Sequence, residues 1–429
     1  MTELVRDSMW GTTLRRLRSP AAWSETVDLF AILTAASLPW STSLAAIFNV
    51  AMLLCMVPFL DVGDFLQSLK RPICALPIAL FLLALVGTLW SEASWGARFY
   101  AVNPTTKLLV LPVLIYHFQR SSRGHLVFIS FLVSCALLSV MSWLVFLHPT
   151  LSLKPPDEPN SRGIFVKNYI DQSQEFTLCA VALAFPIVKL LQQKRVWLAA
   201  LLAAVALSFF VNMAFVVISR TALVTVPIML AVFGLLHLKW RSVLIIFAAL
   251  AALAAVTWKT SSTLHNTIET FSVQYELYKD KGIPTSIGLR LEFWRKSLAF
   301  FAEAPLVGHG TGSTRGLFEQ AATGGPNQAS NEVIGNPHNQ TLNVAVQWGV
   351  VGIIILYAMW AVHLLLFRGD ALASWIGLLV VVQNVFTSLF NSHLFDFHEG
   401  WMYVIGVGVA GGMVLNSHQN GRSPGQARG

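Results

Sequence analysis

The chain has 429 residues, of which 55% are hydrophobic and only 12% are charged, and its mean hydropathy is +0.62. Soluble domains carry about 25% charged residues, so this composition excludes an ordinary soluble enzyme and indicates a membrane protein. The net charge of +8 fits the cytoplasmic Lys/Arg bias of inner-membrane proteins. It does not predict nucleic-acid binding, because no basic stripe with interleaved aromatic residues occurs.

The apolar residues form separate runs of roughly membrane-spanning length, which predict an all-α polytopic fold with about 12 transmembrane helices. The runs do not alternate as the strands of a membrane barrel do. In chain order the expected spans are 27–40, 44–60, 73–90, 108–118, 125–146, 176–191, 196–215, 221–238, 242–258, 351–367, 371–390 and 401–415.

The basic N-terminal segment, with Arg6, Arg15, Arg16 and Arg18, is expected in the cytoplasm. An even number of spans then places both termini there and the long polar segment 259–350 on the outer side. We therefore expect one integrated domain, in which 1–258 holds the first nine spans, 259–350 forms a lid, 351–416 holds the last three spans and 417–429 is a cytoplasmic tail. The four cysteines lie in or at the edge of apolar runs without a CxxC motif, which predicts packing roles.

Arg220 lies in Ile218-Ser219-Arg220-Thr221, between two apolar runs and near the expected outer membrane surface. An Arg at this depth is costly unless it is paired or hydrated. One interpretation is a helix-end residue that reaches the interface. The other is an anion-binding group, because a guanidinium is a permanent cation whose planar donors fit phosphate oxygens. The scarcity of other polar groups in this turn favours the second interpretation.

Residues 288–301 predict an amphipathic helix with an apolar stripe of Leu291, Trp294, Leu298 and Phe301. Arg290 would lie in its first turn. The dipole of a helix N-terminus disfavours a cation and attracts an anion. Arg290 is therefore a second candidate for anion binding, and an ordinary solvated Arg is the alternative.

The run Gly308-His309-Gly310-Thr311-Gly312 matches no nucleotide-binding loop, because no strand precedes it and no Lys-Ser/Thr follows. It predicts a tight turn with close backbone approach.

His338 lies in Asn336-Pro337-His338-Asn339. We expect Asn336 to cap a helix that Pro337 opens and that breaks at Gly349. A neutral imidazole on its first turn, with an ordinary pKa of about 6.5, could take a proton from a hydroxyl group. The alternative is that His338 only bonds a nearby backbone group.

His393, Asp396, His398 and Glu399 lie close together in the last expected outer loop. Their spacing matches no zinc motif. We expect no metal site and no cofactor.

Five stretches in this order resemble the O-antigen ligase superfamily of membrane glycosyltransferases. They are Ser219-Arg220, Gly288-Leu289-Arg290 with Trp294, the glycine-rich run 305–312, Pro337-His338-Asn339 and residues 348–352. The resemblance covers residues 205–366. Trp348 departs from it, because many relatives carry an acidic residue there.

The resemblance implies a GT-C-like enzyme of lipopolysaccharide biosynthesis at the periplasmic face of the bacterial inner membrane. The donor would be a glycan on undecaprenyl diphosphate, and the acceptor a sugar of lipid A–core. Arg220 and Arg290 would bind the diphosphate, and His338 would be the catalytic residue that assists the acceptor hydroxyl. The reaction would be inverting and independent of metal ions.

Two enzyme alternatives belong to the same superfamily: an O-antigen or polysaccharide polymerase, and an O-linked protein oligosaccharyltransferase. A transporter of the lipid-linked glycan is the more distant alternative, and the scarcity of charged residues within the expected spans counts against it. We expect an outer-face cavity between the long loop and the spans near Arg220. Lys107, Arg98 and the loop 147–175 remain candidates for acceptor recognition.

Overall fold

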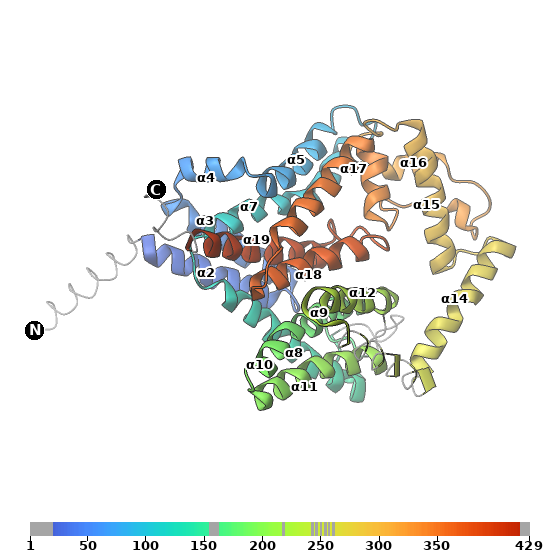
Figure 1. Cartoon of the computed structure of the whole chain (residues 1–429). Coiled ribbons are helices and arrows are strands. Elements are labelled where there is room, and N and C mark those ends of the chain that lie inside the picture. Colours follow the sequence, from blue (N-terminus) through green and yellow to red (C-terminus); the bar gives the residue numbers. More distant parts are fainter. Residues whose placement is uncertain are drawn as a thin grey trace, which may run out of the picture.

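The computed structural model describes residues 20–153, 163–216, 219–241 and 262–420, together with 244, 248, 251–252, 255 and 258–259. Within these residues every regular element is a helix, and none is a strand. The prediction of an all-α fold is therefore confirmed for the described part of the chain (Figure 1).

The helices up to residue 192 are α2 (Pro20–Ser37), α3 (Thr42–Met56), η1 (Val57–Phe59), α4 (Val62–Leu69), α5 (Pro72–Val86), α6 (Trp95–Thr106), η2 (Lys107–Leu109), α7 (Val110–Phe118), α8 (Gly124–Leu147), η3 (Pro149–Leu151), α9 (Tyr169–Ala182) and α10 (Ala184–Gln192). The later ones are α11 (Val196–Phe215), α12 (Arg220–His237), α14 (Ser262–Lys281), α15 (Ser286–Glu303), α16 (Thr314–Gln320), η4 (Ala329–Asn331), α17 (Gln340–Leu366), α18 (Leu372–Thr387) and α19 (Phe397–Asn420).

In the described residues, seven helical segments are long and apolar enough to cross a membrane, and an eighth is added if α4 and α5, bent by 81°, form one broken span. This supports a multi-pass protein, but it confirms only part of the expected set of about 12 spans. Of the remaining expected spans, α12 and α18 are shorter apolar helices, and α2 overlaps the first. The expected span 242–258 lies largely outside the described residues.

The structure corrects one expected loop. Residues 95–106 form α6, which continues through η2 into α7, so that Trp95–Phe118 is a single candidate span. Ser94 starts this helix early, because its hydroxyl accepts a hydrogen bond from Ala97 N at 3.3 Å. The fourth span therefore begins before the position where the hydropathy rises.

The main hydrophobic core lies among α2, α3, α5, α7, α17, α18 and α19. A second cluster joins α8, α9, α11 and α12. A third joins α15, α16 and α17 through Phe293, Phe300, Phe318 and Val346. The polar segment therefore packs onto the helix bundle through α17.

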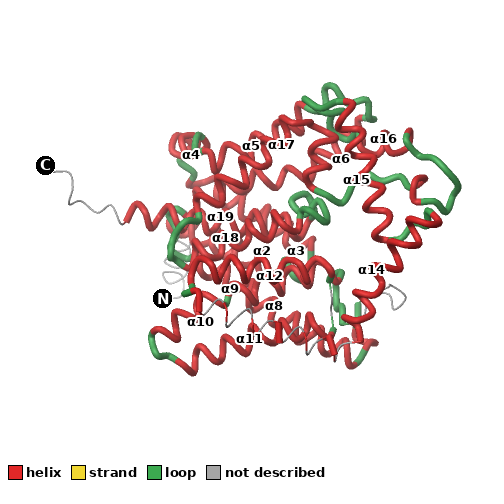
Figure 2. Tube along the Cα trace, turned by 45° about the vertical axis from the view of Figure 1, so that its right-hand side comes forward, coloured by secondary structure: helices red, strands yellow, loops and turns green. Residues whose placement is uncertain are grey.

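Helices α14, α15 and α16 lie at the opposite side of the molecule from the start of α2 and the end of α19 (Figures 1 and 2). Both described ends of the chain thus lie on one side and the long polar segment on the other. The side of the membrane on which each lies stays a prediction.

Candidate functional site

His338 lies in the turn before α17. Its φ is +53°, in the left-handed region that residues other than glycine rarely adopt. Asn336 holds this turn, because its Oδ1 accepts a hydrogen bond from the His338 backbone N–H at 3.0 Å. Asn339 then caps the helix by accepting from Leu342 N at 3.0 Å. The prediction that Asn336 caps the helix and Pro337 opens it is wrong, because the Asn336 side chain closes an Asx turn instead.

The loop between α18 and α19, residues 388–396, packs against this turn and is called the outer loop below. Ser392 Oγ donates to Asn336 Oδ1 at 2.7 Å. Gln340 contributes two bonds: its backbone N–H donates to Ser388 O at 2.8 Å, and its side-chain Oε1 accepts from Leu394 N at 3.1 Å. These contacts fix the position of the outer loop beside His338.

Hydrogen bonds connect His338 through Asn391 to Asp396. His338 Nδ1 lies 2.8 Å from Asn391 Oδ1, and Asn391 Nδ2 donates to Asp396 Oδ2 at 2.6 Å. Within the described part of the chain, the His338 Nε2 atom makes no hydrogen bond. One nitrogen of the half-buried ring is thus hydrogen-bonded by Asn391, and no described residue is bonded to the other.

Arg290 lies close enough to His338 for its charge to act on the imidazole. Burial lowers the pKa of His338 below 6.5; the hydrogen bond to Asn391 opposes this shift, and the Arg290 charge adds to it. The neutral imidazole therefore predominates at neutral pH. The structure brings Arg290 and His338 together, although the residues are far apart in the sequence. Their chemical roles stay predictions.

Helix α15 carries Arg290 as its fifth residue, just beyond the first turn where we expected it. Thr285 caps the helix by accepting a hydrogen bond from Gly288 N at 3.1 Å. The Arg290 side chain is half-buried. On the same helix, Phe293 lies against the site, with its ring centroid 6.2 Å from that of His338.

The predicted apolar stripe of α15 is wrong in part, although its member Trp294 packs against the third hydrophobic cluster. Leu291 and Leu298 are exposed, whereas Phe293 and Phe300 are buried. These two phenylalanines pack edge-to-face on Phe318, with centroid distances of 5.8 and 5.3 Å. Tertiary contacts with α16 therefore rotate the buried face of α15 away from the one that its periodicity predicts.

Two charged residues of α15 make close polar contacts. Glu292 Oε1 lies 2.6 Å from an Arg295 guanidinium nitrogen, and Lys296 Nζ donates to Ser330 O at 2.5 Å. Both Glu292 and Lys296 are buried. The Lys296 contact joins α15 to η4.

Arg220 is the first residue of α12, but its side chain lies outside the described residues. Its neighbour Ser219 is buried, and Ala222 shares a hydrophobic cluster with Phe176 of α9. Helix α9 also carries Asp171, whose carboxylate lies 2.7 Å from Nδ1 of His398, just after the outer loop. The start of α12 thus packs against α9, the helix whose Asp171 contacts His398. Diphosphate binding by Arg220 stays a prediction.

The glycine-rich run forms the predicted tight turn. Gly308, Gly310 and Gly312 all have positive φ, and an added Cβ would lie 2.5 to 2.8 Å from backbone atoms of Gln347, Ser91 and Ala97 respectively. The turn therefore brings α17 and the chain around α6 into backbone contact, which only glycine permits.

The predicted break at Gly349 is confirmed. Its φ of 60° and ψ of −153° interrupt α17. The backbone beyond the break pairs with the chain before the glycine turn, since Val350 N donates to Pro305 O at 2.8 Å. Trp348 beside it is fully buried and donates to Thr311 Oγ1 at 2.8 Å. Where the superfamily pattern has an acidic residue, this chain therefore has a packing residue.

Sequence reasoning missed a group of buried charged residues below the outer loop. Asp171 pairs with His398, and Glu175 lies 3.5 Å from Lys167. Both acidic residues fall within the expected outer loop 147–175, but α9 begins at Tyr169 and buries both carboxylates. A cap signal was present, because Asn168 accepts hydrogen bonds from the backbone of the first turn.

Two candidates for acceptor recognition make other contacts. Lys107 is buried, and its ammonium donates to the carbonyls of Phe395, at 3.0 Å, and of Asp396. Arg98 donates to the carbonyls of Ala93 and Thr88 at 2.6 and 2.9 Å. Both cations therefore stabilise backbone segments, and the structure gives no support for acceptor binding by either.

One group in the described residues has side chains of the kind that hold a metal ion: His393, Asp396 and Glu399, whose ligand atoms lie within 4.8 Å of one another. Burial lowers the pKa of His393 to about 4 and raises that of Asp396 to about 6. The Lys107 ammonium interacts with both carboxylates and supplies positive charge from the protein itself. A metal ion would have to compete with this resident cation.

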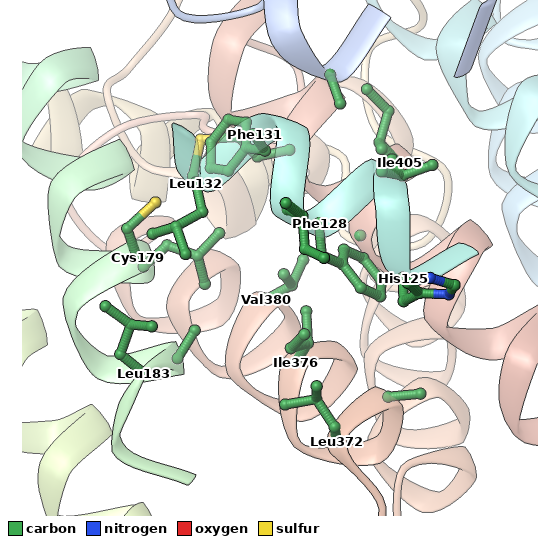
Figure 3. Close-up of a pocket in the computed structure, with 18 of the residues that line it drawn as sticks. His125, Phe128, Phe131, Leu132, Cys179, Leu183, Leu372, Ile376, Val380 and Ile405 are labelled. Carbon is green, nitrogen blue, oxygen red and sulfur yellow. The ribbon is translucent and has the colours of Figure 1, made fainter. Parts of the chain in front are cut away.

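A cavity of about 280 Å³ lies among α8, α9, α18 and α19, and not in the expected place between the long loop and Arg220 (Figure 3). Apolar side chains such as Phe128, Leu132, Ile376 and Val380 line it. Such a lining suits a hydrocarbon chain, and His125 is among the few polar side chains at its edge.

Comparison with known proteins gives one family match. Residues 206–357 match the family described as O-antigen ligase. The matched segment begins in α11, ends in α17 and contains Arg220, Arg290 and His338. A comparison with curated proteins finds no match.

Proposed function

We propose, on the premise that residues 206–357 form a domain of the O-antigen ligase family, that the protein is an O-antigen ligase. It would transfer the glycan of an undecaprenyl-diphosphate donor to lipid A–core. The reaction would take place at the periplasmic face of the bacterial inner membrane, with both termini in the cytoplasm and about 12 spans. The match itself supports a membrane glycosyltransferase that uses lipid-linked glycans.

The observation that best supports this proposal is the arrangement of His338 and Arg290. The Nδ1 side of the His338 ring is bound by Asn391, and the charge of Arg290 acts on the same ring. A site that transfers a glycan from a diphosphate needs a proton acceptor and a permanent cation in reach of one substrate. This pair meets both needs.

In the proposed reaction the acceptor hydroxyl oxygen attacks the anomeric carbon of the donor sugar. His338 Nε2 takes the hydroxyl proton as the new glycosidic bond forms. The bond between the anomeric carbon and the phosphate oxygen breaks, and undecaprenyl diphosphate leaves with that electron pair. Attack from the face opposite the diphosphate inverts the anomeric centre, so His338 should lie across the sugar from the arginines.

Arg290 and Arg220 would stabilise the negative charge that develops on the leaving diphosphate. Guanidinium groups stay charged at any working pH and can bind two phosphate oxygens at once. Two such groups could supply the electrostatic stabilisation that a divalent ion gives in other transferases. We therefore propose a metal-independent reaction.

A direct test is to incubate the purified protein with an undecaprenyl-diphosphate-linked glycan and lipid A–core. A product that joins the glycan to lipid A–core is expected. A longer undecaprenyl-linked glycan would instead identify a polymerase, and glycan on an added acceptor protein would identify an oligosaccharyltransferase. Movement of the intact lipid-linked glycan across vesicles without any transfer would favour the transporter alternative.

A further inference from the structure

We propose that Asn391 and Asp396 are positioning residues that fix the tautomer of His338 and so make its Nε2 atom the proton acceptor. This inference rests on the proposed function of His338. It goes beyond that function because it assigns a role to the outer loop, which lies outside the matched segment 206–357.

The hydrogen-bond directions determine the tautomer. An ionised carboxylate can only accept, so the Asn391 amide must turn its Nδ2 donor toward Asp396 Oδ2, at 2.6 Å. Its Oδ1 atom then faces His338 Nδ1 at 2.8 Å and can only accept. Nδ1 of the neutral imidazole must therefore carry the proton, which leaves the lone pair on Nε2.

The surroundings hold this geometry in place. The backbone N–H of Asp396 donates to Ser392 O at 3.0 Å, and Lys107 Nζ donates to the backbone carbonyl oxygen of Asp396. The strained backbone of His338 fixes the other end of the chain of bonds. Charged and titratable groups from several elements act on this region. They are Arg290 of α15, Lys107 of η2, Asp171 of α9, His393 of the outer loop, and His398 and Glu399 of α19.

If Asn391 and Asp396 orient His338 in this way, their two side chains can be swapped with each other, but neither can be replaced alone. In the variant Asn391→Asp/Asp396→Asn, the new carboxylate accepts from His338 Nδ1 and the new amide donates to that carboxylate. The total charge is unchanged, so this double variant is a matched control for the single ones. Asp396→Asn alone frees the Asn391 amide to turn and present its donor to His338, which favours the wrong tautomer. Asn391→Leu removes the acceptor altogether.

The experiment measures two quantities on the full-length protein and these variants. The first is kcat and KM for glycan transfer. The second is the pH midpoint at which diethyl pyrocarbonate modifies His338, read by mass spectrometry of its peptide. This reagent attacks neutral imidazole, so the midpoint reports on His338 whether or not the protein transfers a glycan. Melting temperature and monodispersity identify any variant that has not folded.

We expect Asn391→Leu and Asp396→Asn to lower kcat by about 10²-fold with little change in KM, because they impair proton transfer and not binding. The kcat of the double variant should be at least about tenfold higher than that of either single variant, because the effects of two residues in contact are not additive. Its modification midpoint should rise by about 1 pH unit, since a carboxylate then contacts the imidazole directly.

A double variant that is no more active than the single ones, or whose His338 midpoint equals that of the wild type, would overturn the proposal. Folded single variants with wild-type kcat would do the same. If the wild-type protein transfers no glycan from any lipid-linked donor, the proposed function fails, while the modification midpoints still decide whether Asn391 and Asp396 act on His338.

Discussion

At the residue scale, the site depends on two side chains that differ in how the protein holds them. His338 is fixed by its own backbone turn and by Asn391, and its ring is half-buried beside Phe293. Arg290 comes from another helix and approaches the same ring. In the proposed mechanism His338 takes the proton and Arg290 supplies a fixed positive charge. Each role can be tested by substitution.

Arg290→Ala is expected to lower kcat for glycan transfer by about 10²–10³-fold, because it removes a donor that stabilises the leaving diphosphate. Arg290→Lys should recover only part of this loss, since an ammonium lacks the planar fork. Arg220→Ala should have a similar effect. Arg315→Ala is the control, because Arg315 lies in the same long segment but is 73% exposed and pairs with Glu319. Unchanged transfer in both Arg290→Ala and Arg220→Ala would rule out diphosphate binding by the two arginines.

His338→Ala should lower kcat by about 10²–10⁴-fold while the protein stays folded, because it removes the proton acceptor. His148→Ala is a suitable control, since His148 is an exposed histidine outside the site. The measurement is transfer in vitro at substrate saturation. Activity close to the wild type would remove His338 from the mechanism.

The pH profile of the wild-type protein gives a further prediction. Burial and the Arg290 charge lower the pKa of His338 below 6.5, so its neutral, proton-accepting form is present above that pKa. The value of kcat should stay level from pH 7 to 8 and fall as the pH is lowered through a midpoint below 6.5. An acid limb centred above pH 7 would contradict the assignment.

At the element scale, the glycine turn and the break in α17 join the polar segment to the bundle. Gly349 has a φ of +60°, and a Cβ there would overlap the backbone of Leu306 and Val307. The break lies one short helical stretch after His338. Separate contacts of Asn336 and Gln340 hold the His338 turn beside the outer loop.

Gly349→Ala should destabilise the protein by at least about 1–3 kcal/mol from backbone strain alone, with further loss from the overlap. Gly316→Ala is the control, since nothing lies within 4 Å of the Cβ it would add in α16. The measurement is the melting temperature of both variants in detergent. Equal melting temperatures would show that the junction tolerates a side chain.

At the scale of the whole molecule, charge is distributed so that the protein supplies its own cations near the outer loop. Lys107 of the bundle lies beneath Asp396 and Glu399, and Arg290 of the polar segment approaches His338. The charged groups come from elements that are distant in the sequence. The polar segment is consequently one half of the site, and the outer loop with the bundle beneath it is the other.

Transfer activity should be unaffected by a strong chelator, because the proposed mechanism uses guanidinium groups where other transferases use a divalent ion. The measurement compares initial rates with and without the chelator after prolonged dialysis. Loss of activity that an added divalent ion restores would contradict this prediction. It would also direct attention to His393, Asp396 and Glu399 as its ligands.

The sequence by itself determined the helical membrane architecture and most of the segments that form helices. Apolar runs such as 196–215 coincide with a helix, and the break at Gly349 was predictable, because hydropathy, glycine and proline act locally. The order of the motifs containing Arg220, Arg290 and His338 also lies in the sequence. It was sufficient to indicate the family that the match at 206–357 supports.

The tertiary structure alone decided which face of α15 is buried, that Lys107 lies beneath the outer loop, and that Asn391 and Asp396 orient His338. His338 and Asn391 are separated by 53 positions and by two helices. No local pattern encodes such a contact, because it depends on how α17, α18 and α19 pack against one another. The same packing buries Asp171 and Glu175, although the sequence alone predicts that both charged residues lie in a solvent-exposed loop.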